Sequence, residues 1–221
     1  MQNLQTYLSG RTSLSESRVE VGGKSYCLAH PDSAEALIDE EDFDLDERLP
    51  YWATIWPSAV ALARYLSARN LSDKKTIELG CGVGLPAVVA LDRGAEVTAT
   101  DHYEIALDFA RQNAKFNTGL ELNTAHLDWH SPHEENLERF DLVLAADVLY
   151  EERNLPALAT LIPGLLATDG EALISTPCRR DTPDFREMMT ANGFTCATQV
   201  ETARQGERDI EVLIQSFRRA S

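Results

Sequence analysis

The feature that most constrains the fold is the regular alternation of strand-like and helix-like segments from Lys75 onward. Short apolar runs of strand length alternate with longer segments in which apolar residues recur at helical spacing. This order is typical of a parallel sheet that is covered by helices on both faces. The sequence therefore predicts an α/β fold with a doubly wound, mostly parallel sheet of seven strands.

The expected elements follow one another closely along the chain. We expect strands at residues 75–79, 95–100, 120–127, 140–146 and 171–176, and helices at residues 85–93, 103–116, 153–167 and 182–191. Two further strands, at 194–200 and 210–217, are joined by a polar segment that is too short for a helical crossover, so the pattern predicts a C-terminal antiparallel hairpin. Another helix is expected at Pro57, after an entry segment rich in aromatic residues, because proline is favoured at the first helical position.

The first 48 residues carry weaker signals. Gly22 and Gly23 separate two alternating runs, which indicates a β-hairpin. An acidic stretch follows at residues 39–47. It is either a solvated loop or a surface that attracts the substrate, and the sequence leaves both interpretations open. We divide the chain into an N-terminal extension, residues 1–48, and one domain, residues 49–221.

Composition narrows the class of partner. The formal net charge is −16, which repels phosphate backbones, so a basic protein segment is a better partner than nucleic acid. No apolar stretch is long enough to cross a membrane and no secretory signal is visible, so we expect a cytoplasmic protein. The four cysteines are widely separated, and His126, His130 and His133 have no further ligand pattern beside them, so we expect no metal site.

A glycine-rich turn at residues 77–84, IELGCGVG, is the first candidate binding element. Gly80 and Gly82, on either side of Cys81, let the backbone turn sharply at the carboxyl end of a strand, where open α/β sheets bind ligands. The dinucleotide fingerprint has its third glycine at the position that Leu85 occupies here. E-x-G-x-G-x-G, beginning at Glu78, instead resembles the methyltransferase version, although a tight turn without a ligand is the alternative.

Two more candidate elements follow neighbouring strands. Asp101 ends a strand, where a carboxylate can accept hydrogen bonds from both hydroxyls of a ribose, and its alternative role is the N-cap of the next helix. Trp129 can stack on adenine while Asp128 accepts from the exocyclic amine, and the alternative for this tryptophan is core packing.

The strand at 140–146 brings Ala146, Asp147 and Tyr150 to the same edge of the sheet. IELGCGVGLPAVVA, LDW, DVLY and the upstream PYWATIWPSAVALARYL together resemble a family of seven-β-strand (class I) S-adenosylmethionine-dependent methyltransferases. It is the protein lysine methyltransferase family that includes the electron transfer flavoprotein beta subunit lysine methyltransferase. The resemblance spans roughly residues 48–176, and D-x-x-Y is its most discriminating part.

The resemblance implies S-adenosylmethionine as the cofactor and two groups of site residues. It implies that Asp147 and Tyr150 face the methyl acceptor. Cofactor contacts are implied for Trp56, Gly80, Gly82, Asp101, Trp129 and Ala146. The chain lacks the N-P-P-Y or D-P-P-Y motif after this strand, which argues against methylation of adenine or of a glutamine amide.

The leading functional hypothesis is methyl transfer to an amine, with a protein lysine as the acceptor. Such a reaction needs an amine held in line with the methyl group and shielded from water. Asp147 would bind the incoming ammonium, and Tyr150 would orient it through its hydroxyl or its ring face. The alternatives are a small-molecule N-methyltransferase and a non-catalytic regulatory protein that only binds the cofactor.

Overall fold

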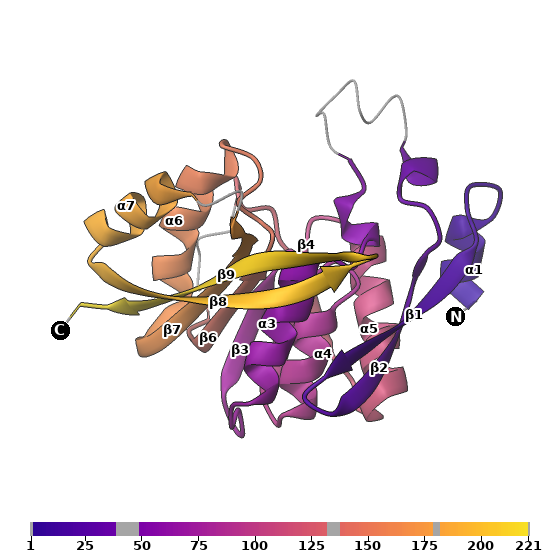
Figure 1. Cartoon of the computed structure of the whole chain (residues 1–221), viewed down its shortest axis with the longest axis horizontal. Helices are drawn as coiled ribbons and strands as arrows, with labels where there is room; N and C mark the ends of the chain where they lie inside the picture. The colour runs from indigo at the N-terminus through magenta and orange to yellow at the C-terminus, as the bar shows by residue number, and fades with distance from the viewer. Residues whose placement is uncertain (1, 39–48, 132–137, 179–181, 221) are drawn as a thin grey trace.

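The computed structural model describes residues 2–38, 49–131, 138–178 and 182–220 (Figure 1). Its central element is a seven-stranded sheet with the order β5-β4-β3-β6-β7-β9-β8. The strands are β3 (Lys75–Leu79), β4 (Glu96–Asp101), β5 (Asn123–His126), β6 (Phe140–Ala146), β7 (Leu166–Pro177), β8 (Phe194–Gln205) and β9 (Arg208–Arg219). Strands β3 to β7 pair in parallel, whereas β9 is antiparallel to both β7 and β8. The predicted fold class is confirmed.

Helices cover both faces of this sheet (Figure 1). The helices are α3 (Pro57–Ser67), α4 (Leu85–Asp92), α5 (Glu104–Thr118), α6 (Asn154–Leu165) and α7 (Pro183–Ala191). In β6, Leu142 and Leu144 belong to the core beneath α3, α4 and α5, and Val143 and Ala145 belong to the core beneath α6 and α7. Because both faces of the strand are buried, its sequence is almost continuously apolar.

Strands β3, β4 and β6 create the place where a ligand can bind. The chain moves outward from β3 in one direction to β4 and β5, and in the other direction to β6 and β7. Loops that leave neighbouring strands at such a reversal diverge to opposite faces, which opens a crevice at the carboxyl ends of the strands. The glycine-rich turn and the segments after β4 and β6 all begin at this edge.

The C-terminal hairpin is longer than the sequence predicts. Strands β8 and β9 stay paired to the register Gln205↔Arg208, so the longer connection expected between strands at 194–200 and 210–217 is wrong. The reason is that Ala203 and Val212 are buried against the α3 side of the core, which stabilises the pairing through this polar segment. Strand β7 also begins earlier than expected, because Leu166 pairs with Phe140 before an irregularity in the register.

The N-terminal residues form a hairpin and a helix. Strands β1 (Leu14–Val21) and β2 (Lys24–Pro31) pair around Gly22 and Gly23, which both have positive φ, as the sequence predicts. Helix α1 (Gln2–Leu8) was not predicted, because it is short and its buried leucines, Leu4 and Leu8, are too few to give a clear helical pattern.

The hairpin packs on the outer side of α5 (Figure 1). The side chain of Asn113 accepts from the backbone N–H of Ala29 at 2.8 Å, and Asn117 does the same for Cys27 at 2.8 Å. These bonds join the first segment to the sheet domain, while the boundary at residues 48 and 49 stays a prediction. The acidic stretch at 39–47 lies outside the described residues. No helix in the described part of the chain is long and apolar enough to cross a membrane.

Candidate active site

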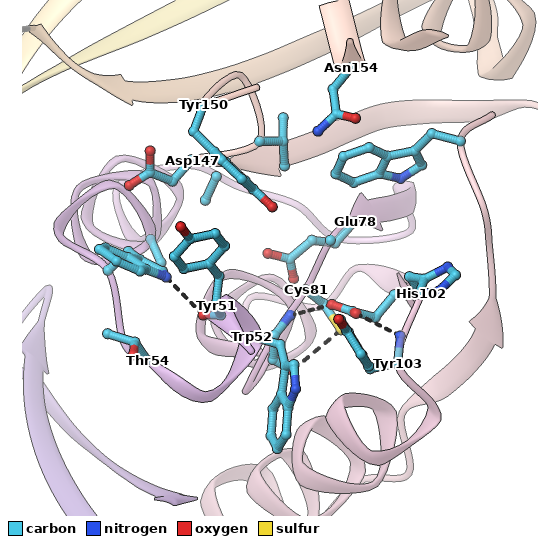
Figure 2. Close-up of a pocket in the computed structure, with 18 of the residues that line it drawn as sticks. Tyr51, Trp52, Thr54, Glu78, Cys81, His102, Tyr103, Asp147, Tyr150 and Asn154 are labelled. Carbon is cyan, nitrogen blue, oxygen red and sulfur yellow. Dashed lines mark hydrogen bonds between the residues drawn. The ribbon is translucent and has the colours of Figure 1, made fainter. Parts of the chain in front are cut away.

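A cavity of about 410 Å³ opens at the carboxyl edge of the sheet. This volume lies in the range of small-molecule and cofactor sites. All eleven site residues expected from the sequence line it: Trp56, Glu78, Gly80, Cys81, Gly82, Asp101, Asp128, Trp129, Ala146, Asp147 and Tyr150. In Figure 2, Asp147 and Tyr150 lie with Tyr51 on one side of the cavity, and Glu78, Cys81 and Tyr103 lie on the other.

The glycine-rich turn requires glycine at both of its cavity-lining positions. Gly80 has φ of 66° and Gly82 has φ of 52°, which side chains with a Cβ rarely adopt. A Cβ on Gly80 would lie 3.0 Å from the ring of Trp129, and one on Gly82 would lie 2.9 Å from the carbonyl oxygen of Trp52. Protein atoms therefore occupy the space that a Cβ would need at both positions, so only glycine fits this turn.

Asp101 is held at the end of β4 by backbone donors. Its Oδ2 accepts from the N–H of Gly82 at 2.9 Å, and its Oδ1 accepts from the N–H of Tyr103 at 3.0 Å. Burial raises the pKa of this carboxyl group, and the backbone hydrogen bonds act in the opposite direction. Helix α5 has Tyr103 as its N-cap, so the alternative role of Asp101 as the N-cap is wrong.

Glu78 is a buried acid, and only one of its two carboxyl oxygens accepts a hydrogen bond in the described structure. Its Oε2 accepts from the N–H of Ala87 at 2.8 Å, which ties β3 to the first turn of α4. Within the described residues its buried Oε1 has no hydrogen-bond partner. Burial raises the pKa of Glu78 well above its usual value. A ligand that donates a hydrogen bond at this oxygen would satisfy it.

Neighbouring Cys81 is equally buried, and burial raises the pKa of its thiol well above the usual value. The backbone N–H of Cys81 donates to the carbonyl oxygen of Thr100 at 2.9 Å. The thiol therefore stays protonated at neutral pH, and this residue lines the cavity without offering a thiolate.

The segment after β5 contributes Trp129, which contacts both the core and the glycine-rich turn. Trp129 is half-buried and packs against the core beneath α6, and its ring also covers Gly80. Asp128 accepts from the backbone N–H of His130 at 2.9 Å, and the ring of His130 lies 3.0 Å from the side-chain oxygen of Asn154. Core packing and cavity lining are thus combined in one side chain.

Asp147 follows β6 in a strained backbone conformation. Its φ of 57° lies in the left-handed region, which is uncommon for a residue with a side chain and often marks functional sites. Its N–H donates to the carbonyl oxygen of Ser175 at 2.8 Å. Its Oδ2 accepts from the hydroxyl of Ser58 at 3.3 Å. The surrounding chain therefore holds this carboxylate at the mouth of the cavity.

An aromatic wall lies beside Asp147. The rings of Tyr150 and Tyr51 meet edge to face with centroids 5.0 Å apart, and those of Tyr51 and Trp56 are 6.0 Å apart. The indole N–H of Trp56 donates to the carbonyl oxygen of Tyr51 at 2.9 Å. Burial raises the pKa of Tyr150, so its hydroxyl remains protonated at neutral pH.

Other cavity residues were missed from the sequence. Tyr51 belongs to the aromatic entry segment, whose density of rings was the available signal, although only Trp56 was singled out there. His102, Tyr103 and Asn154 also line the cavity. His133, part of the histidine segment considered for a metal, lies outside the described residues, and no group of three potential metal ligands is present among the residues that the structure does describe.

Comparison with known sequences identifies relatives of this site. A family model described as lysine methyltransferase matches residues 46–192. Protein N-lysine methyltransferase METTL21A of Xenopus tropicalis is 35% identical over 153 residues, covering 66% of this chain and 69% of that protein. Histone-arginine methyltransferase METTL23 of Xenopus laevis is 36% identical over 110 residues, covering 47% of each chain.

Comparison with solved structures concerns the fold. The magnesium protoporphyrin IX methyltransferase of Synechocystis PCC 6803, solved with bound SAM (S-adenosylmethionine), superposes with a TM-score of 0.57. The identity is 22%, and the alignment covers 72% of this chain and 77% of that one. At this identity the likeness extends to the Rossmann-like methyltransferase fold and no further.

Proposed function

Since the chain belongs to the lysine methyltransferase family, we propose that it transfers a methyl group from S-adenosylmethionine to the side-chain amine of a protein lysine. One observation carries the choice of acceptor. The carboxylate of Asp147 and the rings of Tyr150 and Tyr51 stand together at the mouth of the cavity that the glycine-rich turn also lines. A negative charge flanked by aromatic faces suits an ammonium group.

The residues on the sheet side of the cavity fit the cofactor. The turn at Gly80 and Gly82 lines the cavity, and Glu78 offers a buried acceptor without a partner in the described chain. Asp101 would bind the ribose hydroxyls, and Trp129 and Asp128 would contact the adenine. Trp56 and Ala146, which also line the cavity, would complete the contacts with the cofactor. When bound, S-adenosylmethionine supplies a methyl group on a positively charged sulfur.

On the acceptor side, Asp147 would bind the lysine ammonium before the reaction. A lysine must lose a proton to become nucleophilic, and its ordinary pKa is about 10.4. Asp147 would orient the amine and receive or relay that proton. Tyr150 stays protonated, so its contribution would be to hold the amine through its ring face and hydroxyl, not to act as a base. The aromatic wall would exclude water from this part of the site.

The overall charge supports a basic protein segment as the acceptor. A chain with a formal net charge of −16 attracts cationic partners over a distance. A lysine within a basic segment would therefore be guided to the cavity, where the carboxylate of Asp147 would select its ammonium. The relative described as a histone-arginine methyltransferase makes a guanidinium the competing cationic acceptor within the family.

The test is a labelling experiment. The purified chain is incubated with S-adenosylmethionine carrying an isotopically labelled methyl group and with a lysate of its host, after which proteins and small molecules are separated. We expect label in protein, and methyl-lysine after hydrolysis. The Asp147→Asn variant is assayed in the same way, and Asp169→Asn is its matched control. Because Asp169 is exposed near the opposite end of the sheet, the control variant should label the lysate normally.

Four results would contradict the proposal. Label only in the small-molecule fraction would indicate a small-molecule N-methyltransferase, and label on arginine would indicate a different protein acceptor. Calorimetry that detects S-adenosylmethionine binding, together with no label in any fraction, would indicate a cofactor-binding regulatory protein. Binding of NAD comparable to that of S-adenosylmethionine would contradict the cofactor itself.

A further inference from the structure

Ser58 is a fully buried hydroxyl residue that contacts the acceptor side of the cavity. It is the second residue of α3 and has no exposed surface. Its hydroxyl donates to Oδ2 of Asp147 at 3.3 Å. A buried serine between apolar helix residues is unfavourable unless its hydroxyl is used, so the direction of this hydrogen bond is informative.

Ser58 belongs to a closed circuit of three hydrogen bonds. Ser175, which is also fully buried, donates through its hydroxyl to the carbonyl oxygen of Ser58 at 2.9 Å. The carbonyl oxygen of Ser175 accepts from the N–H of Asp147 at 2.8 Å. Strand β7, the first turn of α3 and the strained residue after β6 are thereby joined through three residues.

The circuit explains how a strained residue keeps its place. The left-handed φ of Asp147 costs on the order of 1–3 kcal/mol, so surrounding contacts must determine it. The bond from its N–H to Ser175 holds the backbone, and the hydroxyl of Ser58 holds the carboxylate. The carboxylate of Asp147 also lies beside the first turn of α3, an eleven-residue helix whose dipole favours a negative charge at this end.

We propose that Ser58 is a positioning residue, one that orients the Asp147 carboxylate toward the amine of the acceptor. This inference rests on the proposed function, in which Asp147 binds the lysine ammonium. At 3.3 Å the hydrogen bond is long for two oxygen atoms, so the carboxylate is oriented by Ser58 and still able to share its charge with an incoming cation. Ser58 itself needs no contact with the acceptor.

The test is a double-mutant cycle of Ser58→Ala and Asp147→Asn. The readout is the initial rate of labelled methyl transfer from S-adenosylmethionine at limiting lysate protein, which is proportional to kcat/KM. We expect Ser58→Ala to lower this rate about threefold to tenfold, the usual worth of one hydrogen bond. In the Asp147→Asn background the same substitution should have no further effect. Affinity for S-adenosylmethionine should stay unchanged.

Ser67→Ala is the matched control. Ser67 lies on the same helix, and its hydroxyl donates to the carbonyl oxygen of Arg64 at 2.7 Å, away from the cavity. It should leave the methyl-transfer rate unchanged. Equal losses of thermal stability and activity in Ser58→Ala and Ser67→Ala would overturn the positioning role, and so would a Ser58→Ala effect that persists in the Asp147→Asn background.

A second readout separates this inference from the proposed function. If Asp147→Asn keeps wild-type activity, or if the wild-type chain labels nothing, the proposed function fails on its own terms. Crystal structures of the wild-type chain and Ser58→Ala then decide the inference. A changed rotamer of Asp147 in the variant supports the positioning role, and an unchanged rotamer overturns it.

Discussion

The two halves of the cavity hold their key carboxylates in different ways. On the cofactor half, Asp101 is 6% exposed and accepts two hydrogen bonds from the backbone of its own loop and of the glycine-rich turn. On the acceptor half, Asp147 is half-buried, and its backbone and side chain are bonded to two serines from other elements. The carboxylate of Asp101 is held by backbone N–H donors, whereas the carboxylate of Asp147 is held by a side-chain hydroxyl.

The difference reflects two kinds of recognition. Backbone amides cannot be changed by substitution of their own side chains, so the cofactor half suits a ligand that never varies. The side chains of Ser58 and Tyr51 belong to segments outside the sheet, so the acceptor half suits variation among relatives. The relatives, named as lysine and as histone-arginine methyltransferases, differ in the acceptor and share the transfer of a methyl group.

The strongest test of this division is Asp147→Asn. Removing one partner of a desolvated charge pair costs about 2–5 kcal/mol, so kcat/KM for the acceptor should fall by roughly 30-fold to 4,000-fold. The dissociation constant of S-adenosylmethionine should remain within about twofold of wild type, because the affected carboxylate serves the acceptor. Steady-state kinetics and calorimetry provide the two measurements. If Asp147→Asn keeps its methyltransferase activity and its normal affinity for S-adenosylmethionine, the proposal that the acceptor is a lysine is wrong.

Asp101→Ala tests the opposite half. We expect cofactor binding to weaken by about 1–3 kcal/mol, roughly 5-fold to 150-fold, because hydrogen bonds to a charged acceptor are lost. The variant should also be less stable, since the N–H groups of Gly82 and Tyr103 lose their acceptor. Calorimetry measures the affinity, thermal unfolding measures the stability, and Asp108→Ala on the exposed side of α5 is the control. Lower stability with unchanged affinity would mean that Asp101 only shapes the turn.

Glu78→Gln tests whether the buried carboxyl group of Glu78 lowers the stability of the ligand-free chain. The pKa of Glu78 is raised in the folded chain, so its ionisation opposes folding as the pH rises above about 4.3, the ordinary value of a glutamate, toward the folded pKa. The amide keeps the bond to Ala87 and carries no charge. We expect the ligand-free variant to gain about 2–4 °C in Tm near pH 7, roughly 1 kcal/mol, and less at pH 5. A gain that is equal at both pH values would argue against ionisation as the cause.

Tyr150→Phe should have the smallest effect. The ring that meets Tyr51 remains, and only the hydroxyl is lost, so we expect kcat/KM to fall about twofold to fivefold with no change in cofactor affinity. The measurement is the same pair of assays that serves Asp147→Asn. A loss as large as that of Asp147→Asn would give the hydroxyl a direct role in handling the proton.

The cofactor half was predictable because its signals are local. The strand β3, its glycines and Glu78 are consecutive, and only glycine suits the backbone that the turn adopts. The alternation of apolar runs likewise predicted each strand of the sheet. The ends of β8 and β9 were not predictable, because partner strands stabilise polar residues that have no strand signal of their own.

The acceptor half depends on contacts between distant segments. Tyr51 and Tyr150 come from segments far apart in the chain and meet on one side of the cavity, and Ser58 reaches Asp147 from helix α3. No local pattern in the sequence encodes these contacts. Ser58, in the first turn of an apolar helix, is therefore indistinguishable by sequence from an ordinary residue at a helix start. Helix α1 was missed for a related reason, since its two buried leucines depend on a surface that the rest of the chain supplies.

Strand β9 lies between β7 and β8, although it follows both in the chain. During translation β8 is therefore made before β9, the strand with which it pairs. Until β9 is made, the hydrogen-bonding edge of β7 remains open and can pair with another chain. We infer that a truncated chain that stops before Arg208 would keep this edge of β7 open and would aggregate more readily than the full sequence.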